Sequence, residues 1–251
     1  MTGSAGVPPA YGNAGVPPAE DAGRMPAFPG RWHSRGYLPH FDKPGLIQSI
    51  TFRLFDSVPA DVIEKWKRDL EWTEYMAADD PKAFELRKRI EDYSDQGYGE
   101  CWLRRDDCAS VVQRALLHFD ADRYHLIEWC VMSNHVHVLI ETLPGHPLET
   151  ILHSWKSFSS KECNRILKRT GRFWMKEYFD RYVRNQKHFD TVVDYIRQNP
   201  VKAGLCKRPE DWKWSSAGTQ VLPGTQASCL QRAGRMPAFP NADPTNRRQT
   251  C

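Results

Sequence analysis

The segment RYHLIEWCVMSNHVHVLIE, from Arg123 to Glu141, gives a clear indication of the fold of this chain. Two runs rich in β-branched and other apolar residues, 123–131 and 135–141, flank the short segment Met132-Ser133-Asn134. Runs of this kind, separated by a few turn-forming residues, predict adjacent antiparallel strands joined as a hairpin. The centre of the chain is therefore expected to form an antiparallel sheet.

The segments around this hairpin alternate between strand and helix patterns. The apolar run LIQSITFRL at 46–54 predicts a buried strand, and 178–184 predicts another. Apolar spacings of three and four residues predict helices over 61–75, 81–93, 147–169 and 189–198, and a further helix that Asp107 would cap. The order of these elements predicts an α+β fold with helices packed on an antiparallel sheet.

Two of these helices carry more specific expectations. In the 147–169 helix, Leu148, Ile151, Trp155 and Phe158 share the predicted apolar face. The 189–198 helix is expected to end near Pro200, because the residue before a proline disfavours the helical conformation.

The two ends of the chain differ from the middle in composition. Residues 1–30 contain AGVPPA twice and then AGRMPAFPG, and residues 221–251 contain AGRMPAFPN within a segment rich in polar residues. Such segments bury too little apolar surface to offset the entropy lost on ordering, so both are predicted to be disordered arms. One folded domain is expected over 31–220, with a helical insertion at about 59–95.

The composition also excludes some classes of protein. The seven cysteines of the 251-residue chain are odd in number and contain no CxxC, which argues against a disulfide framework and indicates reduced thiols. No apolar run is long enough to span a membrane, and the first residues lack a secretory pattern, so a cytoplasmic protein is expected. Acidic residues prevail from Asp56 to Cys108 and basic residues from Pro147 to Gln220, and a basic surface of this kind suits phosphates.

His135 and His137 form the first group that could carry chemistry. Side chains at i and i+2 of a strand point to the same face, so the two imidazoles would project together while Val136 and Val138 face a core. Two such histidines can share a divalent metal ion. The same spacing is also found where histidines merely pack, and both interpretations stay open on spacing alone.

Tyr195 and Asn199 form the second group. They are four residues apart and would lie on one face of the last predicted helix. A phenol becomes a nucleophile when a cation lowers its pKa, and an amide oxygen is a suitable ligand for a magnesium-like ion. An ordinary packed tyrosine fits the spacing equally well, and Tyr178 and Tyr182 are competing nucleophiles.

Four motifs taken in order resemble those of the REP-associated tyrosine transposases, which are single-tyrosine HUH endonucleases. They are WCVMSNHVHVLIE at 129–141, HSWKSFSS at 153–160, FWMKEYFDRYVRN at 173–185 and DYIRQNPVKAGL at 194–205, and the resemblance covers about 36–216. It implies a ferredoxin-like HUH fold in which His135, His137 and Asn199 bind Mg²⁺ or Mn²⁺ and Tyr195 attacks DNA.

The resemblance also implies a reaction and a partner. Tyr195 would cleave and rejoin single-stranded or hairpin DNA of the repetitive extragenic palindrome (REP) type through a 5′-phosphotyrosine. Basic side chains would hold the DNA backbone, namely Lys156, Lys161, Arg165, Lys168, Arg169, Arg172 and Lys202. Exposed Trp155, Trp174 or Tyr182 would stack on bases.

Two other functions remain open at this point. A protein of the same fold could bind structured nucleic acid without cutting it, and a hydrolase could use the His-x-His metal and leave no protein–DNA adduct. The sequence leaves the oligomeric state open.

Overall fold

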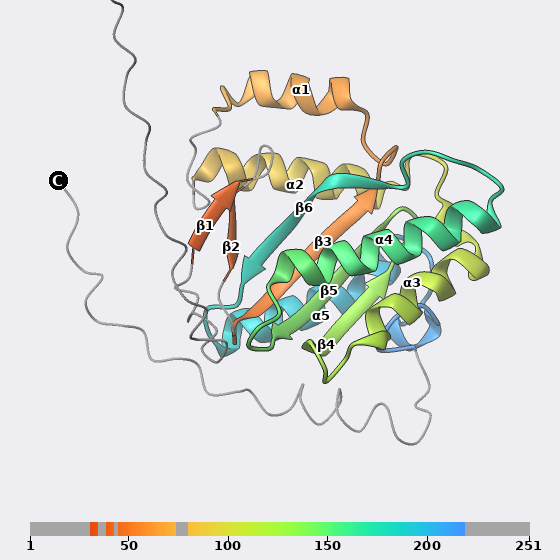
Figure 1. Cartoon of the computed structure of the whole chain (residues 1–251). Coiled ribbons are helices and arrows are strands. Elements are labelled where there is room, and N and C mark those ends of the chain that lie inside the picture. The colour runs from red at the N-terminus through yellow and green to blue at the C-terminus, as the bar shows by residue number, and fades with distance from the viewer. Residues whose placement is uncertain (1–30, 35–38, 43–44, 74–79, 219–251) are drawn as a thin grey trace, which may run out of the picture.

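The structure is a computed structural model that describes residues 31–34, 39–42, 45–73 and 80–218 (Figure 1). The arms predicted at 1–30 and 221–251 lie outside the described residues. Strands are formed by β1 (Arg31–Ser34), β2 (Pro39–Asp42), β3 (Ile47–Leu54), β4 (Tyr124–Val131), β5 (His135–Thr142) and β6 (Trp174–Tyr182). Helices are formed by α1 (Ala60–Asp69), α2 (Pro81–Asp95), α3 (Asp106–His118), α4 (Leu148–Ile166) and α5 (Gln186–Lys202), with short 3-10 turns at Trp102–Arg104 and Pro209–Asp211.

The main sheet has four strands in the order β4-β5-β3-β6, and every neighbouring pair is antiparallel. The predicted hairpin is confirmed as β4 and β5. With α3 between β3 and β4, and α4 between β5 and β6, the chain follows the ferredoxin-like β-α-β-β-α-β order. The fold prediction is therefore confirmed, and α1 and α2 are the helical insertion between β3 and α3. A separate pair of strands, β1 and β2, precedes the sheet.

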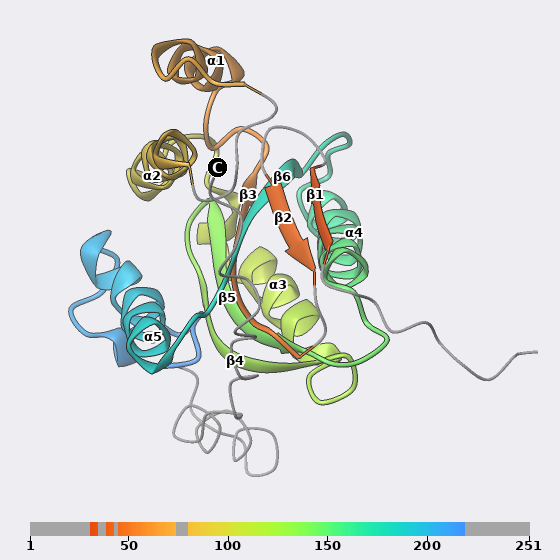
Figure 2. The same cartoon turned by 90° about the vertical axis from the view of Figure 1, so that its left-hand side faces the viewer.

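The two faces of the sheet are covered by different helices. Figure 2 shows α3 and α4 on one side of the sheet and α2 and α5 on the other. The α3/α4 side holds the larger apolar core, to which β5 contributes Val136, Val138 and Ile140 as the alternation predicts. Leu139 faces the other side, where it packs with Phe189 and other apolar residues of α5. The period of two along β5 thus divides its residues between two environments.

Helix α2 of the insertion covers the remaining part of the second face. Leu86 and Ile90 pack with Phe179 of β6 and with Ile63 of α1 in a third apolar cluster. Pro81 is the first residue of α2, as predicted, and the Asp80 carboxylate before it accepts a hydrogen bond from the Lys82 amide (2.7 Å).

Four local predictions need correction. The first helix ends at Asp69 and not at Tyr75, because Glu71 adopts a left-handed conformation (φ 50°) and the Trp72 amide bonds back to the Lys67 carbonyl. Asp107 does not cap α3. The helix starts at Asp106, Arg105 is its cap residue, and the Asp107 carboxylate pairs with the Arg105 guanidinium (2.8 Å).

The other two corrections concern α4 and α5. Phe158 is 45% exposed, since Ser159 takes the inward position at that turn and its hydroxyl accepts a hydrogen bond from Trp174 Nε1 (2.9 Å). Helix α5 does not end before Pro200 but continues to Lys202. Proline removes one hydrogen bond of the helix. The next bonds form, from Ala203 to the Asn199 carbonyl and from Leu205 to the Pro200 carbonyl.

Candidate active site

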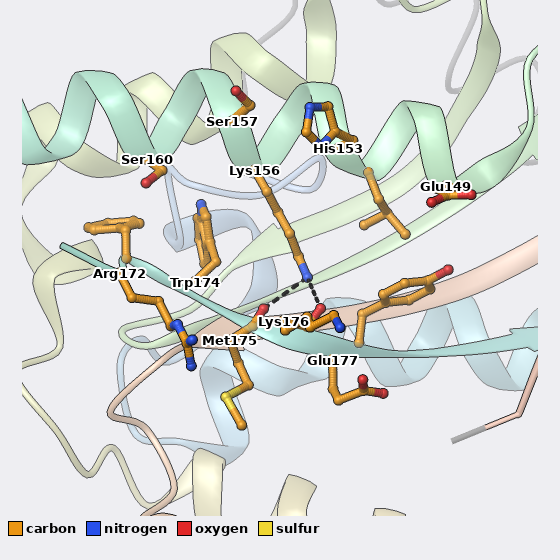
Figure 3. A pocket seen from close by; sticks show the side chains of 13 residues that line it. Glu149, His153, Lys156, Ser157, Ser160, Arg172, Trp174, Met175, Lys176 and Glu177 are labelled. Atoms are coloured by element: carbon orange, nitrogen blue, oxygen red, sulfur yellow. Dashed lines mark hydrogen bonds between the residues drawn. The ribbon is translucent and has the colours of Figure 1, made fainter. Parts of the chain in front are cut away.

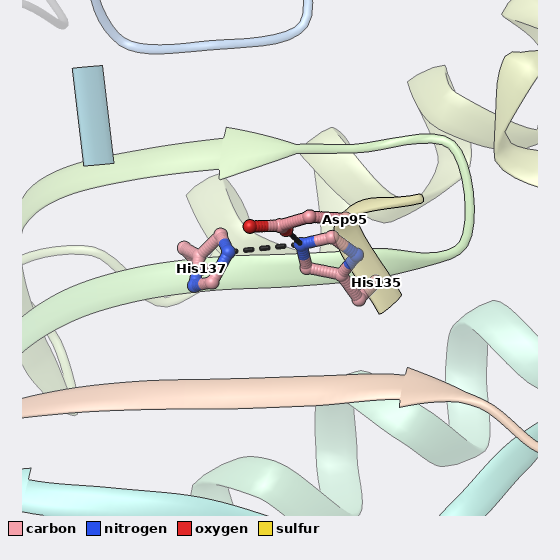
Figure 4. A group of neighbouring side chains, drawn as sticks. All are labelled: Asp95, His135 and His137. Atoms are coloured by element: carbon pink, nitrogen blue, oxygen red, sulfur yellow. Dashed lines mark hydrogen bonds and ion pairs between the residues drawn. The ribbon is translucent and has the colours of Figure 1, made fainter. Parts of the chain in front are cut away.

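His135 and His137 project together from β5 toward α2 and α5, as their spacing predicts. Both residues are 1% exposed, and their Nε2 atoms lie 2.9 Å apart (Figure 4). Burial and the neighbouring His135 lower the pKa of His137 to about 3, so this imidazole is neutral near pH 7. A neutral imidazole can offer a lone pair to a metal ion without first losing a proton.

Polar neighbours fix the orientation of each imidazole. The Asn134 amide donates from Nδ2 to the Tyr98 carbonyl (2.9 Å), which leaves Asn134 Oδ1 to face His135 Nδ1 at 2.7 Å. That oxygen can only accept, so His135 carries a proton on Nδ1, and in its neutral form this imidazole presents a lone pair at Nε2. His137 Nδ1 lies 2.9 Å from the hydroxyl of Thr51, its cross-strand neighbour on β3.

A carboxylate from the insertion completes a group of three ligand-type side chains. Asp95, the last residue of α2, places Oδ1 3.2 Å from His135 Nε2. One atom each from Asp95, His135 and His137 lie within 4.8 Å of one another. Burial acts to raise the pKa of Asp95, but the interactions that His135 and His137 make with this carboxylate when they are protonated hold the pKa below its usual range.

Tyr195 and Asn199 approach the same site from α5. The ring of Tyr195 meets the ring of His137 edge-on, with centroids 5.3 Å apart. Asn199 is 0% exposed and donates from Nδ2 to the Tyr195 carbonyl (3.0 Å). Within the described part of the chain its Oδ1 has no hydrogen-bond partner, a costly state for a buried oxygen and a suitable one for a metal ligand.

The surroundings of Tyr195 oppose its ionisation in the absence of an added cation. Burial raises the pKa of Tyr195, and the negative charges of Glu91 and Asp95 raise it further. Lys202, one turn beyond Asn199, lies with Nζ 5.3 Å from the centre of the Tyr195 ring and supplies positive charge there. The competing Tyr178 belongs to the core on the opposite side of the sheet.

The predicted DNA-binding residues divide between the two sides of the sheet. Lys202 lies beside Tyr195, whereas the others belong to α4 or the segment after it, across the sheet from Tyr195. Three of these have partners within the protein. Lys156 donates to the carbonyls of Met175 and Lys176, and burial lowers its pKa to about 7. Arg165 pairs with Glu162, and the Arg169 guanidinium stacks on Trp102. The remaining three, Lys161, Lys168 and Arg172, are exposed.

A cavity of about 450 Å³ lies between α4 and the edge strand β6 (Figure 3). Lys156, Arg172, Lys176 and Trp174 are among the residues that line this cavity. Trp155, in contrast, is buried and donates from Nε1 to the Tyr124 hydroxyl, so the prediction that it would stack on bases if exposed does not apply.

Asp95, Thr51 and Asn134 are the site residues that the sequence reasoning missed. Asn134 directly precedes His135 and could have been found as part of the same motif. Asp95 has no such signal, because it lies among many acidic residues and reaches the histidines only through the packing of α2 on the sheet.

Comparison with families of known proteins indicates which class of protein this chain resembles. A family model described as transposase IS200 like matches residues 104–199. The match includes both histidines, Tyr195 and Asn199.

Two curated proteins are also similar in sequence to this chain. The REP-associated tyrosine transposase of Escherichia coli (strain K12) is 27% identical over 115 residues, which are 45% of this chain and 67% of the relative. A putative REP-associated tyrosine transposase of Haemophilus influenzae is 26% identical over 104 residues, 37% of this chain and 58% of the relative. These matches confirm the resemblance to the REP-associated tyrosine transposases.

A solved structure of a REP-associated tyrosine transposase bound to a REP hairpin is also similar to this chain. It has a TM-score of 0.42 and 18% identity, over 77% of this chain and 86% of that one. Among the helices that the structure describes, none has the length and apolar character needed to cross a membrane.

Proposed function

We propose that this protein cleaves and rejoins DNA strands, with Tyr195 as the nucleophile. The Tyr195 oxygen forms a bond to the scissile phosphorus, the bond from phosphorus to the 3′ oxygen breaks, and a 3′ hydroxyl leaves. The product is a 5′-phosphotyrosine. Since one phosphodiester replaces another of similar energy, an incoming 3′ hydroxyl can reverse the reaction without ATP.

The observation that carries this proposal is the edge-on contact between Tyr195 and His137. It joins the predicted nucleophile on α5 to the predicted metal ligands on β5, which are about 60 residues apart along the chain. His135 and His137 would hold the ion, and the unpaired Oδ1 of Asn199 fits a ligand role as well. When bound, Mg²⁺ or Mn²⁺ would polarise the scissile phosphate and offset the negative charges that raise the pKa of Tyr195.

The substrate that we propose is single-stranded or hairpin DNA of the REP type, the DNA after which the curated relatives are named. Lys202 would hold the phosphate beside Tyr195. The exposed Lys161, Lys168 and Arg172 on the other side of the sheet would hold a second part of the DNA. A bound DNA strand that contacts both Lys202 and these three residues would pass around an edge of the sheet.

The test is to trap the covalent product. A hairpin oligonucleotide labelled at its 3′ end is incubated with the protein and Mn²⁺ and resolved on a denaturing gel. The wild type should carry the label as a covalent adduct. Tyr195→Phe should bind the hairpin with unchanged affinity and form no adduct, because only the nucleophilic oxygen is removed.

Tyr182→Phe is the matched control, since it removes the same oxygen from a tyrosine of β6. Adduct formation by Tyr195→Phe would overturn the assignment of the nucleophile. Cleavage by the wild type without an adduct would indicate a metal-dependent hydrolase, and binding without cleavage would indicate a nucleic-acid-binding protein that does not cut.

A further inference from the structure

The helical insertion reaches the candidate metal site through the end of α2. Ile90 and Leu86 anchor the helix on Phe179 of β6, and Asp95 follows one turn after Ile90, at the helix end nearest His135. A small cavity between α2 and the sheet is lined by Thr51, His135, Ile90 and others. The insertion therefore lies directly against the histidine that opens the motif on β5.

The loop that follows Asp95 is also attached to this motif. The Tyr98 carbonyl accepts the hydrogen bond from Asn134 that sets the orientation of His135. At Gly99 the backbone adopts φ +87° and passes so close to the Asp56 carbonyl that a Cβ atom would lie 2.8 Å from its oxygen. Asp95 is thus held from both sides, by α2 before it and by this loop after it, and its position is fixed before any ion binds.

The atoms that meet at this point are nitrogen and oxygen atoms of the kinds that bind metal ions. With a proton on Nδ1 that it donates to Asn134, neutral His135 can offer a lone pair at Nε2, and Asp95 adds a carboxylate oxygen 3.2 Å away. His137 Nε2 faces the same point. Acceptor atoms that converge in this way repel one another unless a cation or a shared proton lies among them. Two imidazoles and one carboxylate are a suitable ligand set for a divalent ion such as Mn²⁺.

We infer that Asp95 is a ligand of the active-site metal ion together with His135 and His137, so that the insertion supplies part of the metal site. The inference rests on the metal ion of the proposed function. It gives the acidic insertion a chemical role: α2 delivers a negative charge that favours the ion and compensates its positive charge. Metal binding and the packing of α2 on the sheet are therefore linked, because only the packed helix brings Asp95 to the histidines.

Calorimetric titration of the full chain with Mn²⁺ tests the ligand set without any measurement of activity. Asp95→Asn removes the charge and keeps the size of the side chain. It should weaken Mn²⁺ binding at least as much as loss of an outer-shell partner does, which is roughly 10- to 100-fold. Asp92→Asn is the matched control. It removes an acidic residue from the same helix whose partner is Lys88 on the surface, and should leave the affinity unchanged.

Hydrogen exchange is a second measurement. It distinguishes direct coordination of the ion by Asp95 from a long-range effect of the Asp95 charge. Mn²⁺ should slow the exchange of backbone amides at the end of α2 in the wild type and in Asp92→Asn, and should have no effect on them in Asp95→Asn. Melting without metal ions controls for folding, because Asp95→Asn should unfold near the wild-type temperature. Asp95→Glu, which keeps the carboxylate, should retain more affinity than Asp95→Asn.

The outcomes separate this inference from the proposed function. If Asp95→Asn binds Mn²⁺ as tightly as the wild type while His137→Ala loses binding, Asp95 is not a ligand and the histidine site stands. If wild type, Asp95→Asn and His137→Ala all fail to bind Mn²⁺, or bind it equally, the metal site itself is wrong and a shared proton accounts for the close Nε2 atoms.

Discussion

One side of the central sheet holds the main apolar core, and the other side holds the candidate active site. On the α3/α4 side, β5 buries Val136, Val138 and Ile140 in an apolar core, whereas on the α2/α5 side the same strand buries His135 and His137 among polar groups. Burial of apolar groups stabilises the fold. Burial of histidines is favourable only when hydrogen bonds or a metal ion compensate for the lost water. Neighbouring residues of β5 therefore differ in what their burial requires. The apolar residues need only close packing, and the histidines need hydrogen bonds or a metal ion.

The largest difference should appear between His137 and Ile140. Ile140→Ala should lower the free energy of unfolding by about 2–5 kcal/mol, because it leaves a cavity in the apolar core. His137→Ala should abolish adduct formation and the stabilisation by Mn²⁺. Denaturant unfolding with and without Mn²⁺ measures both effects. If Ile140→Ala loses metal-induced stabilisation and His137→Ala keeps it, the assignment of the two sides is wrong.

Two titratable groups on the α2/α5 side should give the stability of the protein a pH dependence. The folded-state pKa of His137 is about 3, below the unfolded value of about 6.5, so the stability it contributes is present above pH 6.5 and is lost as the pH falls toward 3. The slope should be at most about 1.4 kcal/mol per pH unit. Glu91 acts in the opposite sense, because burial raises its pKa to about 7 and its contribution is lost as the pH rises from 4.5.

The difference between the wild type and His137→Asn isolates the histidine from Glu91. Unfolding is measured with a chelator present, at several values between pH 4 and pH 7. The destabilisation caused by acid should be smaller in His137→Asn. Equal slopes for the two proteins would show that His137 titrates normally and is not buried as a neutral imidazole.

The smallest effects are expected from the surface lysines of the two sides. Lys202→Gln and Lys168→Gln should each weaken hairpin binding slightly and reduce the salt dependence by about one phosphate contact. Only Lys202→Gln should also slow adduct formation at saturating DNA, since Lys202 alone of the two lies beside Tyr195. Equal slowing by both variants would mean that the DNA connects the two surfaces more tightly than we propose.

The sheet and its site histidines could be predicted because strand alternation is a local property. The pattern His135-Val136-His137-Val138 specifies which residues face the core wherever the strand lies. The ends of α1 and α5 could not be predicted in this way. A left-handed Glu71 ends α1 without glycine, and tertiary packing retains Pro200 within α5.

The parts of the site that depend on packing between distant segments were also beyond sequence reasoning. The spacing of four residues predicts Tyr195 and Asn199 on one helix face, but nothing in the spacing connects Asp95 to His135. The basic residues of α4 illustrate the opposite problem. Their sequence pattern predicts one DNA-binding surface, and it does not show that Lys156 is half-buried against backbone carbonyls of β6 or that the sheet separates α4 from Tyr195.

Identification of the residue that carries the DNA is the direct test of whether Tyr195 is the nucleophile. The adduct formed with a hairpin oligonucleotide and Mn²⁺ is digested with nuclease and protease, and the modified peptide is sequenced by mass spectrometry. We expect a 5′-linked nucleotide on Tyr195, absent when a chelator replaces Mn²⁺. A nucleotide on Tyr178 or Tyr182, or an adduct that forms equally well with the chelator, would contradict it.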